Sequence, residues 1–112
     1  MHNQKINATI SRKSIDLILA ERVRQSMVED YTIIHDDEHT EGQLALLAAA
    51  YVLSSREDLL GPSMSTTRKS LRLILMSYRW SFKPKDPIRD LIRAGALILA
   101  ELDRRLRLQK EV

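Results

Sequence analysis

Potential metal ligands are concentrated in residues 35–39, and a further carboxylate follows two positions later. Imidazole and carboxylate groups together suit zinc, manganese, iron or nickel. Because the only other histidine is His2, a histidine-based metal site has to lie in this segment. The alternative interpretation is that these carboxylates precede a helix, whose dipole favours negative charge there, and face solvent. The candidate ligands here are His35, Asp36, Asp37, His39 and Glu41.

Cations that could hold phosphate groups lie in two parts of the chain. One group is on the first predicted helix, where a guanidinium offers a fork of donors suited to phosphate or to a nearby carboxylate. The other surrounds the start of the last predicted helix, where Asp90 is either part of an ion-paired surface ladder or a carboxylate facing a site. Solvated helix faces are the alternative for both groups. The candidate phosphate ligands are Arg22, Arg24, Lys83, Lys85 and Arg89.

Two aromatic residues, Trp80 and Phe82, alternate with cations just before the last predicted helix. A ring in such a position can stack on a nucleotide base while the neighbouring cations hold its phosphates. Aromatic residues that flank a helix start also serve as anchors to the core, and both interpretations stay open for Trp80. The chain has no Gly-x-Ser-x-Gly motif and no glycine-rich phosphate loop, so serine hydrolase chemistry has little support.

The composition predicts an all-α fold in which helices position these groups. Hydrophobic residues make up 44% of the 112 residues, with only three Gly and three Pro, and most are Leu, Ile, Ala, Val and Met. The absence of cysteine excludes a disulfide scaffold, a thiol nucleophile and cysteine-ligated metals. No apolar run approaches the ~20 residues of a membrane span, and the first residues lack the apolar core of a signal peptide. We therefore expect a cytoplasmic protein without membrane contact.

The apolar spacing predicts three or four helices in one domain, residues 1–112, with 1–13 loosely ordered. The first helix is predicted to begin at an N-cap, Ser14, and to end near Val28. An acidic loop is expected over 29–39. The apolar face of the first helix is predicted to consist of Ile15, Ile18, Leu19, Val23 and Met27.

The second helix is predicted to begin with a capping box, Thr40 to Gln43, and to continue through an apolar run to Leu53. Because that run is apolar all round, we expect it at the centre of the core. A connection over 54–65 follows, and then 67–78, where helical spacing competes with a short buried strand at 71–76.

The last helix has the clearest predicted start, with Asp86 as N-cap and Pro87 at the first helical position. Its apolar stripe is expected to pack into the core, and it is long enough to support assembly of several copies. The predicted stripe consists of Ile88, Leu91, Ile92, Gly95, Ile98, Leu99, Leu102 and Leu106.

The charge is unevenly distributed along the chain. Residues 1–66 hold six basic and ten acidic groups, a net charge of −4, whereas residues 67–112 hold twelve and five, a net charge of +7. A basic half can attract nucleic acid, nucleotide phosphates or the acidic half of another copy. Solvated helix faces would explain the same pattern.

Four motifs resemble those of a family of small phage and prophage proteins of uncharacterised activity, over about residues 18–106. The order of helices is also similar, more remotely, to MazG-like members of the all-α nucleoside triphosphate pyrophosphohydrolases. The motifs are Glu21-Arg22-x-Arg24-Gln25, His35-Asp36-Asp37-x-His39-x-x-Gly42-x-Leu44-Ala45, Lys83-Pro84-Lys85 and Arg89-Asp90-Leu91-Ile92-Arg93-Ala94-Gly95-Ala96-Leu97-Ile98-x-Ala100-Glu101.

The second resemblance implies a helical oligomer whose carboxylates hold magnesium or manganese against a triphosphate. Carried over to this chain, it gives Asp36, Asp37, Glu41 and Asp90 as metal ligands. Arg93 and Gln43 stand where further carboxylates are expected. Either the site is rebuilt around residues 35–41, or the fold keeps binding without catalysis.

The leading hypothesis is therefore a phage-type, homo-oligomeric nucleotide-binding protein of the pyrophosphohydrolase-like kind. The alternative is a non-enzymatic interaction protein that binds a host protein or sequesters a signalling nucleotide. A third hypothesis is nucleic-acid binding through the basic half, which predicts an affinity that falls steeply with salt.

Overall fold

The protein is an all-α bundle, as predicted from its composition. The computed structural model describes residues 10–28, 33–38, 40, 42–56, 69–70, 72–73, 75 and 83–111, and contains no strand among them. Its helices are α2 (Arg12–Val28), α3 (Ile33–Glu38), α4 (Gln43–Ser55) and α7 (Pro87–Glu111). No described helix combines the length and the apolar character that crossing a lipid bilayer requires.

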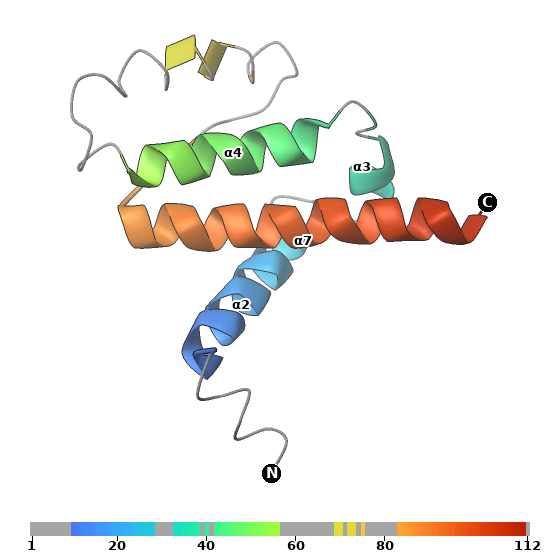
Figure 1. Ribbon diagram of the computed structural model, residues 1–112, viewed down its shortest axis with the longest axis horizontal. Helices are drawn as coiled ribbons and strands as arrows, with labels where there is room; N and C mark the ends of the chain where they lie inside the picture. Colours follow the sequence, from blue (N-terminus) through green and yellow to red (C-terminus); the bar gives the residue numbers. More distant parts are fainter. Residues whose placement is uncertain are drawn as a thin grey trace.

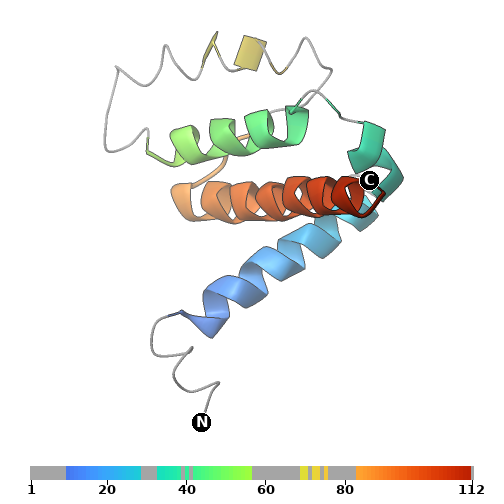
Figure 2. The same ribbon diagram turned by 45° about the vertical axis from the view of Figure 1, so that its right-hand side comes forward.

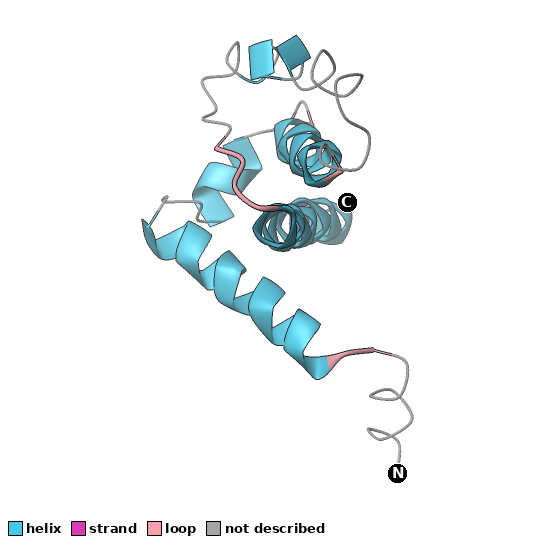
Figure 3. Ribbon diagram, turned by 90° about the vertical axis from the view of Figure 1, so that its left-hand side faces the viewer, coloured by secondary structure: helices cyan, strands magenta, loops and turns pink. Residues whose placement is uncertain are grey.

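Helix α7 is the centre of the arrangement. Helix α4 runs antiparallel beside its first half, while α2 lies on another side of α7 and crosses it steeply (Figure 1 and Figure 2). The view along α7 shows α4 and α2 on opposite sides of it (Figure 3). The short helix α3 lies beside the second half of α7 (Figure 1). Each of the other three helices therefore contacts α7 at a different place.

The apolar core lies between α4, α7 and Leu75, and α2 contributes no residue to it. Alanines on both long helices allow them to approach closely. Helix α2 instead approaches α7 at Gly95, where an added Cβ would stand 2.9 Å from Ile18 Cδ1. The core cluster consists of Leu44, Leu47, Ala48, Ala50, Tyr51, Leu75, Ala94, Leu97 and Ala100.

The predicted start of the last helix is confirmed. Pro87 is the first residue of α7. The Oδ1 atom of Asp86 accepts the backbone N–H of Arg89 at 2.9 Å, which is the bond expected of an N-cap carboxylate. Proline at the first helical position leaves no additional donor unsatisfied.

Three predicted boundaries are wrong. Helix α2 begins at Arg12 rather than after Ser14, because the Oγ atom of Ser11 accepts the Ser14 N–H and provides the cap. Helix α4 begins at Gln43 without a side-chain cap, because Gly42 makes the turn with a left-handed φ of 79°. It extends through Ser55, into the predicted connection. Residues 33–38 of the predicted acidic loop form α3.

The predicted apolar stripe of α7 is not the face that packs against α4, which carries alanines, Leu97 and paired charges instead. Most large members of the stripe are exposed, whereas Ile92 and Leu99 are half-buried and Gly95 is approached by Ile18 of α2. The apolar face predicted for α2 is also exposed apart from Ile18, and the buried residues of this helix are Glu21 and Gln25. The exposed apolar residues of the two predicted faces are Ile15, Leu19, Val23, Met27, Ile88, Leu91, Ile98, Leu102 and Leu106.

The prediction that α4 lies at the centre of the core is confirmed for one side of the helix only. Leu44, Leu47 and Tyr51 are buried in the core, whereas Ala45, Ala49 and Val52 lie at the surface. Within the predicted helix 67–78, residues 69–70, 72–73 and 75 are helical. The other residues of that segment, and residues 1–9, lie outside the described part of the chain.

Candidate functional site

The linker of residues 83–86 is held in place by side chains from two helices. The Lys83 N–H donates to Tyr51 Oη of α4 at 3.1 Å, and the Lys85 N–H donates to Asp90 Oδ1 of α7 at 2.7 Å. The Arg93 guanidinium donates to the Lys83 carbonyl oxygen at 2.6 Å. Because the backbone is fixed, the exposed side chains of Lys83 and Lys85 project from defined points beside the start of α7.

Asp90, in the first turns of α7, is a buried carboxylate with one unused oxygen. The residue is 1% exposed, and its Oδ1 atom accepts the Lys85 N–H. Its Oδ2 atom is buried and has no hydrogen-bond partner. A buried charged oxygen without a partner is unfavourable unless a ligand completes it. This atom is therefore the strongest candidate for a cation ligand in the described part of the chain.

Arg93 lies beside Asp90 on α7 and carries a buried positive charge. Its guanidinium carbon lies 5.6 Å from the centre of the Tyr51 ring, and its Nη1 atom donates to Tyr51 Oη at 3.4 Å. Its Nε atom has no hydrogen-bond partner. The resemblance described above led us to expect a carboxylate here. The structure gives this arginine a positioning role, because it holds the linker and Tyr51 together.

The polar face of α2 is buried against α7. Arg24 donates two hydrogen bonds to Glu21, at 2.8 and 2.7 Å, and Gln25 donates a third at 3.2 Å. Burial raises the pKa of Glu21, but these bonds and the charge of Arg93 outweigh it and hold that pKa below its usual value of 4.5. The Oε1 atom of Gln25 is buried without a partner. These hydrogen bonds lie within α2, so the contact between α2 and α7 combines the charge of Arg93 acting on Glu21 with the close approach of Ile18 to Gly95.

The acidic segment connects α3 to two other helices. Asp36 is fully buried and forms an ion pair with Arg22 of α2. Asp37 pairs with Arg107 of α7 at 2.7 Å, and both of these side chains are partly exposed. Helix α3 is thus joined to α2 and α7 by carboxylates that the sequence offered as metal ligands. Among the described residues, no three His, Cys, Asp or Glu side chains are grouped as a metal site would need.

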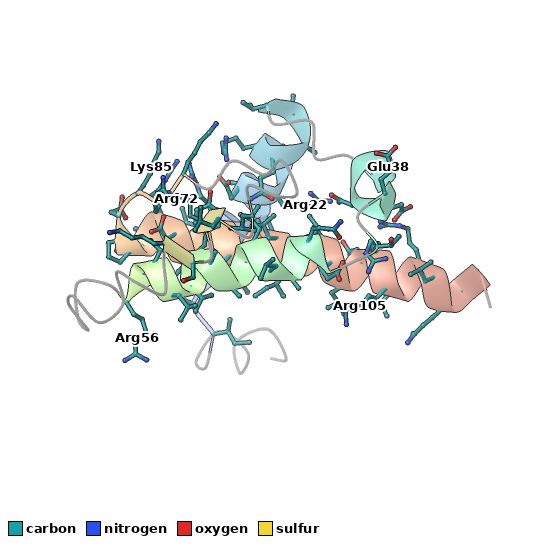
Figure 4. The ribbon with its side chains drawn as sticks, turned by 90° about the horizontal axis from the view of Figure 1, so that it is seen from above. Arg22, Glu38, Arg56, Arg72, Lys85 and Arg105 are labelled. Carbon is teal, nitrogen blue, oxygen red and sulfur yellow. The ribbon has the colours of Figure 1, made fainter. Side chains whose placement is uncertain are left out.

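The predicted site residues do not all meet in one place. Asp90 lies near the start of α7 with Lys83, Lys85 and Arg89, whereas Asp37 is bound 17 positions further along the helix, at Arg107. At ~1.5 Å per residue this separation is about 25 Å, so one ion does not reach both carboxylates. In Figure 4, Lys85 and Glu38 accordingly project near opposite ends of the bundle.

The predicted phosphate ligands fall into two groups. Arg22 and Arg24 form ion pairs with carboxylates, whereas Lys83, Lys85 and Arg89 are exposed around the start of α7. His39, Glu41 and Trp80 lie outside the described residues, and His35 is described only as part of the α3 backbone.

Sequence reasoning did not assign a site role to Tyr51, Arg93, Glu21 or Gln25. Three of them fall within the motifs quoted for the resemblance, which was the available signal. Tyr51 lies outside those motifs. Its only signal is a hydroxyl group in an otherwise apolar run, because a buried tyrosine hydroxyl needs a hydrogen-bond partner.

Comparison of the chain with known protein families, with curated proteins and with solved structures finds no match.

Proposed function

We propose that this protein binds a nucleoside phosphate together with a divalent cation where linker 83–86 meets the start of α7. The observation that carries the proposal is the buried Oδ2 atom of Asp90, which has no partner. Magnesium and manganese prefer such oxygen ligands. Magnesium usually retains several waters and takes one or two protein carboxylates plus phosphate oxygens, so this single carboxylate is a sufficient protein anchor.

The cations near Asp90 supply the phosphate contacts in this proposal. Lys83 and Lys85 project from a fixed backbone, and Arg89 is exposed in the first turn of α7. The positive end of the α7 dipole adds to their attraction for anions. The proposal takes only Asp90 from the predicted metal ligands, because Asp36 and Asp37 are engaged in the contacts of α3.

The test is calorimetric titration of the full chain with a panel of nucleoside triphosphates, in magnesium, in manganese and in excess chelator. Asp90→Asn keeps an acceptor for the Lys85 N–H and removes the charge, so we expect it to abolish the metal-dependent part of the affinity. Replacing Lys83 and Lys85 together by Ala should weaken binding at least about tenfold, because a charge-assisted hydrogen bond contributes about 1.5–3 kcal/mol.

The matched controls are Asp103→Asn and Lys110→Ala, which change exposed charges of the same helix away from the linker. Both should bind as the unmodified chain does. Equal affinity in all four variants, or binding that ignores the metal, would show that the site is not where we propose.

Catalysis is a second, separable part of the proposal. The pyrophosphohydrolase-like hypothesis requires release of monophosphate and pyrophosphate, which chromatography of the products detects. In that reaction a bound metal would polarise a phosphoryl oxygen and activate a water, while this chain's lysines orient the phosphates. Binding without turnover would leave a nucleotide-binding or nucleotide-sequestering protein of the phage type that the motifs resemble.

The exposed apolar side chains of α2 and α7 favour a second candidate function, a non-enzymatic interaction protein. Large exposed apolar surfaces mark contacts with other proteins. This alternative predicts neither turnover nor a metal requirement. It gains support only if the titrations above show no nucleotide binding by folded protein.

A further inference from the structure

A hollow lies on the surface where α4 and α7 meet. Its volume is about 670 Å³, within the range of about 300–1,000 Å³ that small-molecule sites occupy. Because alanines form much of the α4 side, their short side chains leave space that larger residues would fill. The apolar lining includes Ala45, Ala49 and Val52 of α4 and Ile98 and Leu102 of α7, and we call this place the α4–α7 hollow.

The walls of the α4–α7 hollow suit an alkyl chain. None of the thirteen residues of α4 is Asp, Glu, Lys or Arg, and Ile98 and Leu102 of α7 are about half exposed. Water against such walls finds few hydrogen-bond partners, so an apolar group that displaces it gains affinity. An extended peptide fits less well, because its backbone N–H and C=O groups need partners that these walls lack.

The charged residues beside the hollow carry an excess of positive charge. Among the described residues of its lining, only Glu101 and Arg105 are charged. Hydrogen bonds from Arg104 and Arg105 hold the pKa of Glu101 below its usual value, so this buried carboxylate stays ionised at neutral pH. One negative and two positive charges give this group a net charge of +1. Asp37, a further carboxylate that acts on Arg104, pairs with Arg107 and does not change that balance.

Arg105 is the exposed member of this charged group. Its side chain is 61% exposed, and it pairs with Glu101 Oε2 through Nε at 3.1 Å and Nη2 at 3.0 Å. A guanidinium has five N–H donors, so the donors on Nη1 remain for a further anion. Carboxylate and phosphate groups are the anions that match this fork of donors. The hollow thus combines apolar walls with one exposed cation.

We propose that the α4–α7 hollow binds one molecule of an anionic single-chain amphiphile, such as a fatty acid. The alkyl chain lies against Ala49 and Ile98, and the anionic head contacts Arg105. This site is separate from the proposed nucleotide site and does not depend on it. In Figure 4, Arg105 accordingly projects on the opposite side of the α4–α7 pair from Lys85.

Two larger occupants fit the hollow less well. A lipid surface binds helices that carry many Lys and Arg residues, whereas α4 has none and Arg105 is the exposed cation among the described residues of the lining. A helix of a partner protein is about 10 Å across with its side chains, so it covers a hollow of this size, whereas a narrower alkyl chain enters it. Shape and charge together therefore favour a free amphiphile.

The experiment is calorimetric titration of the full chain with dodecanoate, below the concentration at which it forms micelles. Dodecyl maltoside and dodecyltrimethylammonium carry the same chain on a neutral and on a cationic head. We expect dodecanoate to bind at least about tenfold more tightly than either, because only its head accepts charge-assisted hydrogen bonds from Arg105. Decanoate, which is shorter by two methylene groups, should bind about tenfold more weakly than dodecanoate.

Two variants separate the role of the head from that of the chain. Arg105→Gln should remove the preference for dodecanoate and leave the affinity for dodecyl maltoside unchanged. Its matched control is Lys110→Gln, which removes an exposed charge of α7 away from the hollow. Ala49→Leu fills the hollow and should weaken the binding of dodecanoate and dodecyl maltoside at least about tenfold. Its control is Ala20→Leu, at an exposed position of α2, which should bind both as the unmodified chain does.

Four results would overturn the proposal. These are no binding of dodecanoate by the folded chain, equal affinity for the three head groups, a preference for dodecanoate that survives Arg105→Gln, and dodecanoate binding unchanged by Ala49→Leu. Sedimentation with phosphatidylglycerol vesicles tests the lipid surface, and a chain that binds these vesicles but not free dodecanoate would also overturn it. Asp90→Asn should bind dodecanoate as the unmodified chain does, so this proposal and the proposed function fail separately.

Discussion

Helix α7 is bound on one side by apolar packing and on another by buried polar groups. Helix α4 contacts it through leucines and alanines that exclude water. Helix α2 buries Glu21 and Gln25 and brings Ile18 close to Gly95 of α7, but leaves apolar residues such as Leu19 and Val23 exposed. An amphipathic period therefore identifies two faces of a helix without deciding which one is buried.

The contact of α4 with α7 and the contact of α2 with α7 are stabilised by different interactions. Apolar burial stabilises in proportion to the area removed from water. A buried polar contact stabilises only when its groups find partners, and here Arg24, Gln25 and Arg93 act on Glu21. We therefore expect α4 to dominate the stability of the bundle and α2 to be more sensitive to single charged residues.

The largest expected effect is in the apolar contact. Leu47→Ala, at a position that is 1% exposed, should lower the free energy of unfolding by about 2–5 kcal/mol, because it leaves a cavity in the core. Val23→Ala on α2 is the control and should cost less than about 0.5 kcal/mol. Denaturant unfolding followed by circular dichroism measures both. Similar values for the two variants would contradict the distinction between the contacts.

The next effect is at the centre of the polar contact. Arg93→Ala removes the bonds to the Lys83 carbonyl and Tyr51 and takes away a positive charge that acts on Glu21. We expect a loss of about 3 kcal/mol, because groups that remain buried lose their partners. Arg89→Ala, one turn away and exposed, should change unfolding by less than about 0.5 kcal/mol. A stability unchanged by Arg93→Ala would mean that α2 and the linker are held by other contacts.

A smaller effect separates Asp36 and Asp37, two of the three carboxylates of α3. Asp36→Asn weakens an ion pair between Arg22 and a fully buried carboxylate and should cost about 2 kcal/mol. Asp37→Asn weakens a partly exposed pair with Arg107 and should cost less than about 1 kcal/mol. If the urea midpoints of Asp36→Asn and Asp37→Asn shift equally, the burial of the carboxylate does not determine how much each ion pair stabilises the fold.

The smallest effect is a dependence on pH. The pKa of Glu21 in the folded state lies below its usual value of 4.5, so the stability that its carboxylate provides is present above 4.5. It is lost as the pH falls from 4.5 through the lower folded pKa. The pKa of Glu101 is also lowered, by Arg104 and Arg105 of the same helix, so the stability that this carboxylate provides is likewise lost as the pH falls. Glu21→Gln should therefore flatten the fall in unfolding free energy below pH 4.5, and a fall as steep as that of the unmodified chain would exclude Glu21 as a source.

The start of α7 could be predicted because its signal is local. Asp86 and Pro87 act on backbone groups within one turn, and no distant residue alters that chemistry. The cap of α2 was placed three residues late because Ser11 and Ser14 are equally suitable, and only the backbone path shows which hydroxyl is used. The turn at Gly42 was not predicted, although its left-handed φ of 79° is a conformation that glycine adopts readily.

The buried face of α7 could not be predicted from its apolar period. Large residues such as Leu102 dominate that period, whereas the residues that meet α4 include alanines and charged groups. An alanine counts little in a hydropathy pattern, yet it decides how closely two helices approach. Glu101 and Arg104 are buried as an ion pair within the helix, whereas Asp90 and Arg93 are buried with partners on linker 83–86 and α4.

The candidate site was predictable in part. Asp90, Lys83 and Lys85 lie close along the chain, so proximity alone places them together. Tyr51 is 32 residues from Lys83, and its role depends on the antiparallel pairing of α4 with α7. Such a contact is a property of the tertiary structure, which a single sequence does not display.

The three hydrogen bonds that fix linker 83–86 connect any ligand on it to the folded state as a whole. Asp90 and Arg93 hold the linker only while α7 is folded, and Tyr51 holds it only while α4 lies on α7. A compound that binds Lys83 and Lys85 in this geometry therefore raises the melting temperature by mass action, and thermal-shift screening can find it before its identity is known. By the same coupling, a synthetic peptide that spans only the linker and the first turns of α7 should not bind the compound.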